Sequence, residues 1–333
     1  MKKLINITYN NIISIENLLE AWKEFRSGKK SRKEVQQFER NFMTNVLELH
    51  NDLTRKTYVH LGYEAFNISD PKPRNIHKAS VRDRLLHHAV YRKLYPFFDY
   101  AFVSDSYSCR LEKGTHKSIN RFRKFAYIVS QNHTKTAWVL KCDVRRFFAS
   151  INQEVLTTIL KEYIVDLDIL SLLIAIVESF HSTREGVGLP LGNLTSQLLI
   201  NIYMNKFDHW MKHKMKAEYY IRYTDDFVIL SDDKNWLLEL LPKIADFLEE
   251  NLQLYLHPDK IFIKTIASGV DFLGWINFPY HRVLRTTTKN KMFRKIRSKI
   301  DNEAVIQSYL GLLSHGNTRK LQDKANSIKM NAT

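Results

Sequence analysis

The stretch that most constrains the fold is segment 220–230, in which two adjacent carboxylates lie between two apolar runs. The flanking runs, 220–223 and 227–230, are rich in aromatic and β-branched residues and therefore predict strands. Asp225 and Asp226 between them predict a tight hairpin turn. Two neighbouring carboxylates concentrate negative charge, and a divalent cation is the expected partner because hard cations prefer carboxylate oxygen. An ordinary surface turn is the alternative, since Asp is frequent in turns.

The composition indicates a folded protein with a polyanionic partner. At 333 residues the chain is long enough for two or three subdomains. Its 51 Lys and Arg residues outnumber 35 Asp and Glu residues and give a net charge of +16, which favours nucleic acid as the partner over an ordinary basic surface. Cys109 and Cys142 are too few for a disulfide framework or a zinc site, so we expect a reducing, cytoplasmic setting. No apolar run approaches the length of a membrane span, and we expect no membrane partner.

Apolar periodicity and turn residues predict an alternation of helices and short strands along the chain. The predicted helices cover residues 12–24, 34–56, 81–90, 153–181, 198–211, 236–252 and 289–300. The predicted strands and hairpins cover residues 57–78, 137–143, 220–230, 254–263 and 270–276. This mixture predicts an α+β fold.

A second candidate carboxylate stands at the end of the strand predicted for residues 137–143. A strand that ends in Asp143 can deliver its carboxylate to a metal, although an exposed Asp at a strand exit is the simpler alternative. Phe147 and Phe148 follow, and one of them could pack in the core while the other forms the wall of a sugar pocket.

Three basic or glycine-containing segments could contact phosphates. Lys72 and Arg74 flank a proline at the tip of the predicted hairpin and could clamp a phosphate, or they could belong to a solvated turn. The loop 186–197 enters a helix, whose N-terminus can receive a phosphate. The basic helix 289–300 has an apolar stripe and could lie along a phosphate backbone, although a solvated basic face is the alternative.

A strand-end Asp, a hairpin Asp pair and a basic chain together describe a site for phosphoryl transfer. In a two-metal site, carboxylates from different strands hold two divalent ions about 4 Å apart, which clamp the attacking and leaving oxygens. Positioning and charge neutralisation then supply most of the rate. From carboxylates and charge alone, a metal-dependent nuclease is also possible, although a nuclease would not explain Phe148 or the Leu-Pro-x-Gly loop.

Seven motifs in order resemble the successive sequence blocks of reverse transcriptases, over roughly residues 55–315. They are Lys72-Pro-Arg74, Arg82-Asp-Arg84, Asp143 with Phe147-Phe148, Leu189-Pro-Leu-Gly192, Tyr223-Thr-Asp225-Asp226, His257-Pro-Asp-Lys260 and Phe272-Leu-Gly274. The resemblance implies a right-hand polymerase fold with fingers, a palm of antiparallel sheet with helices, and a short helical thumb. We expect N-terminal helices and fingers at residues 1–135, the palm at 136–280 with a helical insertion near 153–185, and the thumb at 281–333.

The resemblance also implies the role of each site residue. It assigns catalysis to Asp143, Asp225, Asp226 and Lys260, the last as a positioning group or proton donor for pyrophosphate. It assigns two Mg²⁺ ions, for which Mn²⁺ can substitute, to Asp143, Val144, Asp225 and Asp226. It assigns the dNTP to Lys72, Arg74, Phe148 (as the steric gate against a 2′-OH), Leu191 and Gly192. It assigns the template and primer to Arg82, Arg84, Gln197, Lys291, Arg294 and Lys295.

The fourth block departs from the commonest reverse transcriptase pattern, Gln-Gly-x-x-x-Ser-Pro. Leu191 replaces the first Gln and Gln197 replaces the Pro, which resembles the polymerases of diversity-generating retroelements. That resemblance implies an error-prone enzyme of bacterial, archaeal or phage origin. Its expected partners are template RNA, the RNA/DNA hybrid, dNTPs and a small basic accessory protein or other subunit. A compact anti-phage defence reverse transcriptase that uses a non-coding RNA, and a catalytically inactive RNA-binding relative, are the alternatives.

Overall fold

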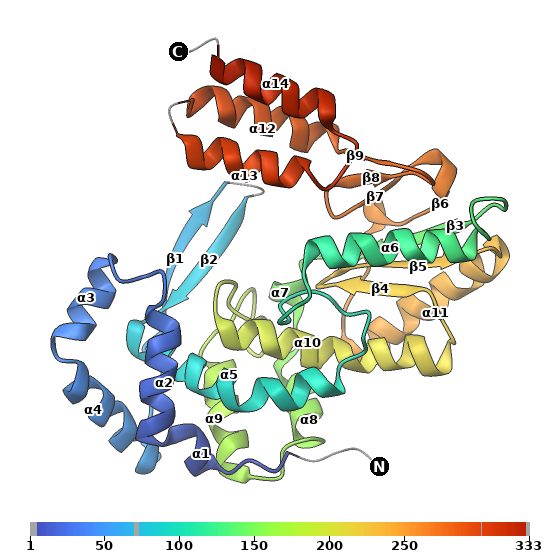
Figure 1. Cartoon of the computed structure of the whole chain (residues 1–333). Helices are drawn as coiled ribbons and strands as arrows, with labels where there is room; N and C mark the ends of the chain where they lie inside the picture. The colour runs from blue at the N-terminus through green and yellow to red at the C-terminus, as the bar shows by residue number, and fades with distance from the viewer. Residues whose placement is uncertain (1–4, 70–72, 301, 331–333) are drawn as a thin grey trace. The chain divides into compact units, whose positions relative to one another are not determined.

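The computed structural model describes residues 5–69, 73–300 and 302–330 and divides into two compact units (Figure 1). Unit 1 comprises Met1–Ser104, Val144–Lys214 and Ile244–Leu256. Unit 2 comprises Asp105–Asp143, Met215–Lys243 and His257–Thr333. Each unit is therefore assembled from three separate stretches of chain.

Unit 1 is mainly helical. Its helices are α1 (Tyr9–Ile13), α2 (Ile15–Arg26), α3 (Lys33–Arg40), α4 (Phe42–Thr54), α5 (Val81–Ala101), α7 (Phe147–Ser150), α8 (Gln153–Lys161), α9 (Leu167–Glu178), α10 (Leu194–His209), the π-helical turn Trp210–Lys214 and the C-terminal part of α11 (Lys234–Leu252). Helix α10 packs against α5 and α8, and every residue from Leu198 to Asn205 is buried. A helix buried on all sides is the centre of its core.

The expected hairpin is present in unit 1 as β1 (Tyr63–Ile68) and β2 (Arg74–Ala79), which pair antiparallel. The helix expected at 34–56 is instead two helices. Asn41 ends α3 and begins α4 with a non-helical backbone, and its φ of −116° and ψ of 40° break the hydrogen-bond ladder there. A short polar residue tolerates such a junction because its side chain competes for backbone hydrogen bonds.

Unit 2 contains two antiparallel sheets. The larger has the strand order β4 (Tyr220–Tyr223), β5 (Asp226–Ser231), β3 (Trp138–Asp143), β6 (Phe262–Thr265). The smaller consists of β7 (Val270–Phe272), β8 (Trp275–Asn277) and β9 (Arg282–Leu284). Helix α6 (Thr115–Val129) lies across one face of the larger sheet, as Figure 1 shows, and buries Phe122 and Phe125 against Val139, Ile221 and Val228.

The strand expected at 254–263 begins later than predicted. Residues Pro258–Lys260 form a 3₁₀ turn, and β6 starts only at Phe262. Pro258 has no backbone N–H to give to a sheet ladder, so the chain turns before it pairs with β3.

Three C-terminal helices complete unit 2: α12 (Thr286–Ser298), α13 (Glu303–Leu313) and α14 (Arg319–Met330). Their apolar faces pack around Trp275 of β8, which is 1% exposed. Gly316, between α13 and α14, lies so close to this ring that a Cβ would stand 2.7 Å from Trp275 Cη2. The indole therefore fixes the path of the loop between the last two helices.

The structure agrees with the expected α+β class, with antiparallel strands in both units. The boundaries expected for fingers, palm and thumb remain predictions. Within the described ranges, no helix is both long enough and apolar enough to cross a lipid bilayer.

We expect Gly316→Ala to lower the melting temperature, because its methyl group would overlap the Trp275 ring and overpacking costs about 1–3 kcal/mol. The matched control is Gly311→Ala, within α13, where a Cβ meets no atom within 4 Å. That variant should gain about 0.4–1 kcal/mol by restricting the unfolded chain. Thermal unfolding followed by tryptophan fluorescence measures both, and equal melting temperatures would contradict the packing described here.

Candidate active site

The sheet of unit 2 brings two carboxylates face to face. In the antiparallel register of β3 and β5, Asp143 is paired directly with Asp226. Residues paired in this way have Cβ atoms about 4.5–5.5 Å apart on one face of the sheet. Asp225 precedes Asp226 in the turn, so the three carboxylates predicted from sequence lie at one end of the sheet. Like charges at this separation repel, and cations are needed to hold them there.

Two lysines supply the positive charge. Lys260 Nζ lies 2.8 Å from Asp143 Oδ1, and Lys141 Nζ lies 3.2 Å from Asp226 Oδ2. Lys260 is positioned by the backbone, because the N–H of His257 donates to the Asp143 carbonyl at 2.8 Å and so attaches the 3₁₀ turn to the end of β3. Lys141 is 10% exposed and also donates to the Asp271 carbonyl at 3.0 Å.

The pKa of Asp226 reflects the balance of charges in the site. Burial raises the pKa of its carboxyl group to about 6, Lys141 opposes the shift, and the charges of Asp143 and Asp225 raise the pKa further. At neutral pH this carboxyl group is therefore ionised, although burial and the negative charges of Asp143 and Asp225 disfavour the ionised form. Its Oδ1 is buried and accepts no hydrogen bond within the described part of the chain. A buried charged oxygen without a donor is costly, so an additional cation would be stabilising.

These properties suit a divalent metal. The donors are carboxylate oxygens, which hard cations prefer, and one of them has an unused lone pair. In residues 5–69, 73–300 and 302–330, no three His, Cys, Asp or Glu side chains are grouped as a closed metal site. The carboxylates of Asp143 and Asp226 are instead neutralised separately by Lys260 and Lys141. Asp143, Asp225 and Asp226 are the residues that would hold the ions.

The turn that carries Asp225 has a strained backbone. Tyr223 pairs with Asp226, which leaves a two-residue loop, and Thr224 has the positive φ of 59° that such loops require. A β-branched residue in this conformation costs about 1–2 kcal/mol. The carbonyl of Thr224 accepts a hydrogen bond from Arg222 Nη1 at 3.0 Å, and its hydroxyl donates to the Ser108 hydroxyl at 2.5 Å. These contacts stabilise the loop conformation.

Segment 105–108 supports this turn from one side. Ser106 forms a parallel bridge with Arg222, and the N–H of Arg222 donates to the Asp105 carbonyl at 3.0 Å. The Arg222 side chain is fully buried and donates to the Ser106 hydroxyl at 3.0 Å. Arg121 of α6 donates to the Asp105 carboxylate at 2.8 Å. The turn is thereby connected through a buried guanidinium to the helix under the sheet.

Unit 1 contains a separate cavity of about 550 Å³ lined by two of the residues assigned to the dNTP, Phe148 and Leu191. It is lined by Pro73, Asn75, His77, Arg146, Phe148, Ala149, Phe180, His181, Ser182, Thr183, Leu189 and Leu191. Phe148 lines the cavity, whereas Phe147 is 3% exposed and packs in the core. The structure thus decides which of the two aromatics can contact a ligand.

Hydrogen bonds to β2 fix the position of Leu191. The N–H of His77 donates to the Leu191 carbonyl at 3.0 Å, and the Asn193 side-chain amide donates to the His77 carbonyl at 2.7 Å. Gly192 between them has a φ of 113°, and a Cβ there would stand 2.8 Å from the Ile76 side chain. Only glycine allows this close approach without strain.

The remaining predicted site residues are placed as follows. Lys72 lies outside the described residues, Arg74 is exposed at the start of β2, and Val144 is buried beside Leu256. Arg82 forms an ion pair with Asp52 at 2.6 Å, and Arg84 forms one with Glu34 at 3.0 Å. Gln197 is partly buried in the first turn of α10, and Lys291, Arg294 and Lys295 lie on α12, where Arg294 is exposed. Their roles toward template and primer remain predictions.

Sequence reasoning missed three contributors. Lys141 stands two residues before Asp143 in an apolar strand, and the two-residue period of a strand places both on one face. That signal was available in the sequence. Arg222 and His77 gave no comparable signal, because their contacts join segments far apart in the chain.

Known proteins are similar to this chain in sequence and in structure. A family described as "Reverse transcriptase (RNA-dependent DNA polymerase)" matches residues 69–277. Protein YkfC of Escherichia coli K12 is 24% identical over 260 residues, which cover 66% of each chain. A putative COX1/OXI3 intron 2 protein of Saccharomyces cerevisiae is 21% identical over 329 residues, covering 80% of this chain and 35% of that protein.

A solved structure shows the fold. The apo telomerase of Candida tropicalis, truncated from its C-terminal domain, aligns with a TM-score of 0.51 and 14% identity, covering 73% of this chain and 60% of that one. The likeness identifies the α+β right-hand polymerase fold that the sequence predicted. This chain spans about two thirds of YkfC and smaller shares of the other two proteins.

We expect the affinity for Mn²⁺ to fall as the pH drops through about 6, because the proton on Asp226 competes with the metal. Below that pH, one displaced proton lowers the apparent affinity about tenfold per pH unit. Asp226→Asn should weaken binding and remove this dependence. Asp259→Asn, a carboxylate 88% exposed on the neighbouring turn, is the control and should change neither. Electron paramagnetic resonance of free Mn²⁺ gives the affinity, and a pH-independent wild type would contradict the assignment.

Proposed function

Because the chain belongs to the reverse transcriptase family, we propose that it is an RNA-directed DNA polymerase that makes cDNA on an RNA template. The observation that carries the proposal is the opposed pair Asp143 and Asp226, with Asp225 adjacent and a lysine on each member of the pair. Carboxylates can hold the metal ions that accompany a triphosphate, and lysines can bind its phosphate oxygens. The family match favours polymerisation over the nuclease alternative.

Each residue of the carboxylate site has a task in this reaction. The chemistry that two divalent ions supply when bound is activation of the primer 3′-hydroxyl and neutralisation of the triphosphate. Asp143, Asp225 and Asp226 would hold them. Lys260 is 45% exposed, so its ammonium can leave Asp143 and turn to the pyrophosphate as the group that positions it or donates a proton. Lys141 is almost buried, so it stays with Asp226 and favours the ionised form of that carboxyl group.

We further propose that the cavity of unit 1 receives the sugar and base of the incoming dNTP. Phe148 is the large rigid side chain on its wall, and it would exclude a 2′-hydroxyl by shape. His77 and Phe180 contribute a second aromatic wall, with ring centroids 4.6 Å apart. The cavity has the size of an ordinary small-molecule site of about 300–1,000 Å³.

For the biological role we propose a polymerase of the diversity-generating type, which copies its RNA with errors. Leu191 supports this, since it lines the cavity at the position where the common pattern has Gln. Leu has no donor or acceptor for the nascent pair, and strong rejection of a wrong partner needs polar groups that a mismatch leaves unpaired. Template RNA, the RNA/DNA hybrid and a small basic accessory protein are the partners that this role requires, in the cytoplasm of the host.

The direct test is primer extension on a defined RNA with labelled dNTPs and Mg²⁺. Asp225→Asn keeps the shape of the side chain and removes a charged ligand, so incorporation should fall by several orders of magnitude while RNA binding persists. Asp232→Asn removes an exposed carboxylate just after β5 and serves as the control. No synthesis by the wild type would support the inactive RNA-binding alternative, and normal synthesis by Asp225→Asn would contradict the metal assignment.

Sugar selection tests the cavity separately. Phe148→Ala should open space for a 2′-hydroxyl and raise ribonucleotide incorporation relative to deoxyribonucleotides. Phe180→Ala removes an aromatic side chain of equal size from the same cavity and should alter KM without this change in selectivity. Single-nucleotide incorporation kinetics with rNTP and dNTP measure the ratio. An unchanged ratio in Phe148→Ala would show that this side chain is not the gate.

Fidelity tests the biological role. Leu191→Gln should reduce misincorporation by restoring a polar group at the cavity wall, whereas Leu191→Met, apolar and of similar size, should leave the error spectrum unchanged. Sequencing of cDNA from a defined RNA gives both spectra. Accurate copying by the wild type would favour the anti-phage defence alternative, which needs no misincorporation, and would leave the polymerase proposal intact.

A further inference from the structure

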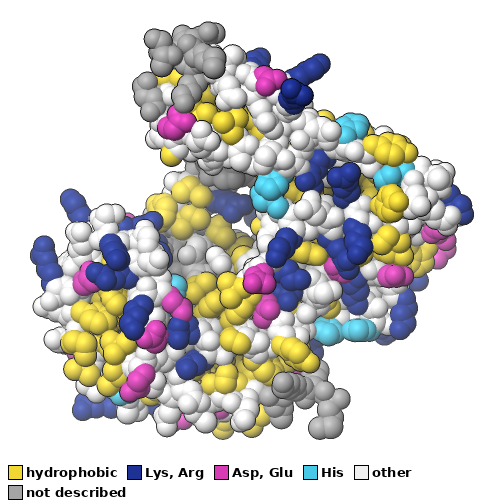
Figure 2. Space-filling view, viewed as in Figure 1, with side chains coloured by type: hydrophobic (Ala, Val, Ile, Leu, Met, Phe, Trp, Pro, Cys, Tyr) yellow, Lys and Arg dark blue, Asp and Glu magenta, His cyan; other side chains and the backbone are white. Residues whose placement is uncertain are grey.

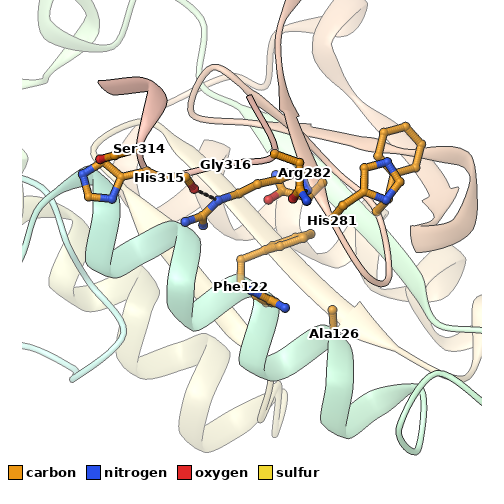
Figure 3. Close-up of a pocket in the computed structure, with 11 residues that line it drawn as sticks. Phe122, Ala126, His281, Arg282, Ser314, His315 and Gly316 are labelled. Atoms are coloured by element: carbon orange, nitrogen blue, oxygen red, sulfur yellow. Dashed lines mark hydrogen bonds between the residues drawn. The ribbon is translucent and has the colours of Figure 1, made fainter. Parts of the chain in front are cut away.

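A second cavity, of about 310 Å³, lies within unit 2 and outside the carboxylate site. Its floor is formed by the middle of α6, from which Phe122 and Ala126 point into it. The β8–β9 turn and the loop between α13 and α14 form the other sides, as Figure 3 shows, with Arg282 extending above Phe122. A cavity of this volume suits one small molecule or a single nucleotide.

The cavity carries positive charge without a carboxylate. No Asp or Glu is among the residues that line it. The lining residues do include two arginines, Arg123 and Arg282, and two histidines, His281 and His315. Figure 2 shows Lys, Arg and His side chains gathered over this part of unit 2. Burial lowers the pKa of Arg282, and the charge of Arg123 lowers it further. The two guanidinium groups thus repel each other, which an anion between them would relieve.

The side chains that carry this charge differ in how they are held. Arg282 Nε donates to the His315 carbonyl, and its Nη1 donates to the Asn120 side chain at 3.0 Å. The guanidinium also lies over the Trp275 ring, 5.6 Å from its centroid. Arg123 is exposed and forms no hydrogen bond or ion pair with the described residues. One cation is therefore fixed by the protein, and the other is available to a ligand.

An aromatic pair lies beside these cations. Phe278 and His281 stack across the β8–β9 turn, with centroids 4.7 Å apart and planes inclined by 12°. The Phe278 N–H donates to the His281 carbonyl at 2.9 Å and closes the turn. Gly269 makes room for the ring, since a Cβ there would stand 2.7 Å from the Phe278 side chain. The pair is thus fixed, and its exposed member, His281, lines the cavity together with Phe278.

We propose that this cavity binds one nucleotide unit, with its phosphate between Arg123 and Arg282 and its base against the Phe278–His281 pair. Guanidinium groups match the geometry of phosphate, and a flat ring accepts a base by stacking without selecting its identity. A plain anion site would use the cations but not the rings. The nucleotide can come from a free nucleoside monophosphate or from an unpaired position of RNA, which present the same chemistry.

The test is equilibrium binding of a fluorescent AMP to the full chain in EDTA, where no metal can join the AMP phosphate to the carboxylates of the candidate active site. Arg123→Gln and His281→Ala, both changes of exposed side chains, should each weaken binding about tenfold or more. Lys124→Gln removes an equal charge from the neighbouring exposed position of α6, outside the cavity, and should have no effect. Unlabelled AMP should displace the probe far better than inorganic phosphate or adenosine does.

Competition distinguishes the two sources. If a single-stranded RNA displaces the probe, and does so less well in Arg123→Gln, the site serves RNA. If AMP binds but RNA does not displace it, the site serves a free nucleotide. Equal affinity in the Arg123→Gln and Lys124→Gln variants, or displacement by phosphate as effective as by AMP, would overturn the proposal. None of these readouts requires polymerase activity, so the result is independent of the proposed function.

Discussion

The repulsion between Asp143 and Asp226 is the constraint on which the carboxylate site depends. The register of β3 and β5 places these side chains opposite each other, and the hydrogen-bond ladder does not let them separate. Lys141 and Lys260 compensate the charge from opposite directions, one from within β3 and one from the 3₁₀ turn that is bound to the end of β3. The unsatisfied oxygen of Asp226 shows that the compensation is incomplete, and a site that still attracts cations is what metal-dependent catalysis needs.

A strained turn presents the third carboxylate, and its support extends into the core. Thr224 holds a backbone conformation that favours glycine, and Arg222 stabilises it from a fully buried position. Successive residues of α6 then serve different parts of unit 2. Arg121 holds segment 105–108 beside the turn, Phe122 packs under the sheet and lines the second cavity, and Arg123 brings charge to that cavity. One helix thus connects the proposed catalytic and nucleotide-binding features of this unit.

Much of this could be predicted from the sequence. The hairpin around Asp225 and Asp226 follows from two β-rich runs with two polar residues between them, and the strand that ends in Asp143 follows from its apolar composition. Both are local patterns that a short segment specifies by itself. The order of the motifs along the sequence indicated the family without any use of the structure. The errors were also local in origin, since Asn41 interrupts a continuous helical pattern and Pro258 delays a strand.

By itself, then, the sequence determined the family, the three candidate carboxylates and the types of the strands that carry them, because propensity, polarity and spacing are properties of consecutive residues. Tertiary structure alone decided which charges meet. It paired Asp143 with Asp226, chose Phe148 over Phe147 for the cavity, and engaged Arg82 and Arg84 in ion pairs. It also gathered Arg123, His281 and Arg282 around one cavity. These outcomes depend on contacts between residues tens to more than a hundred positions apart, whose partners are set by strand register and packing, and no local pattern specifies either.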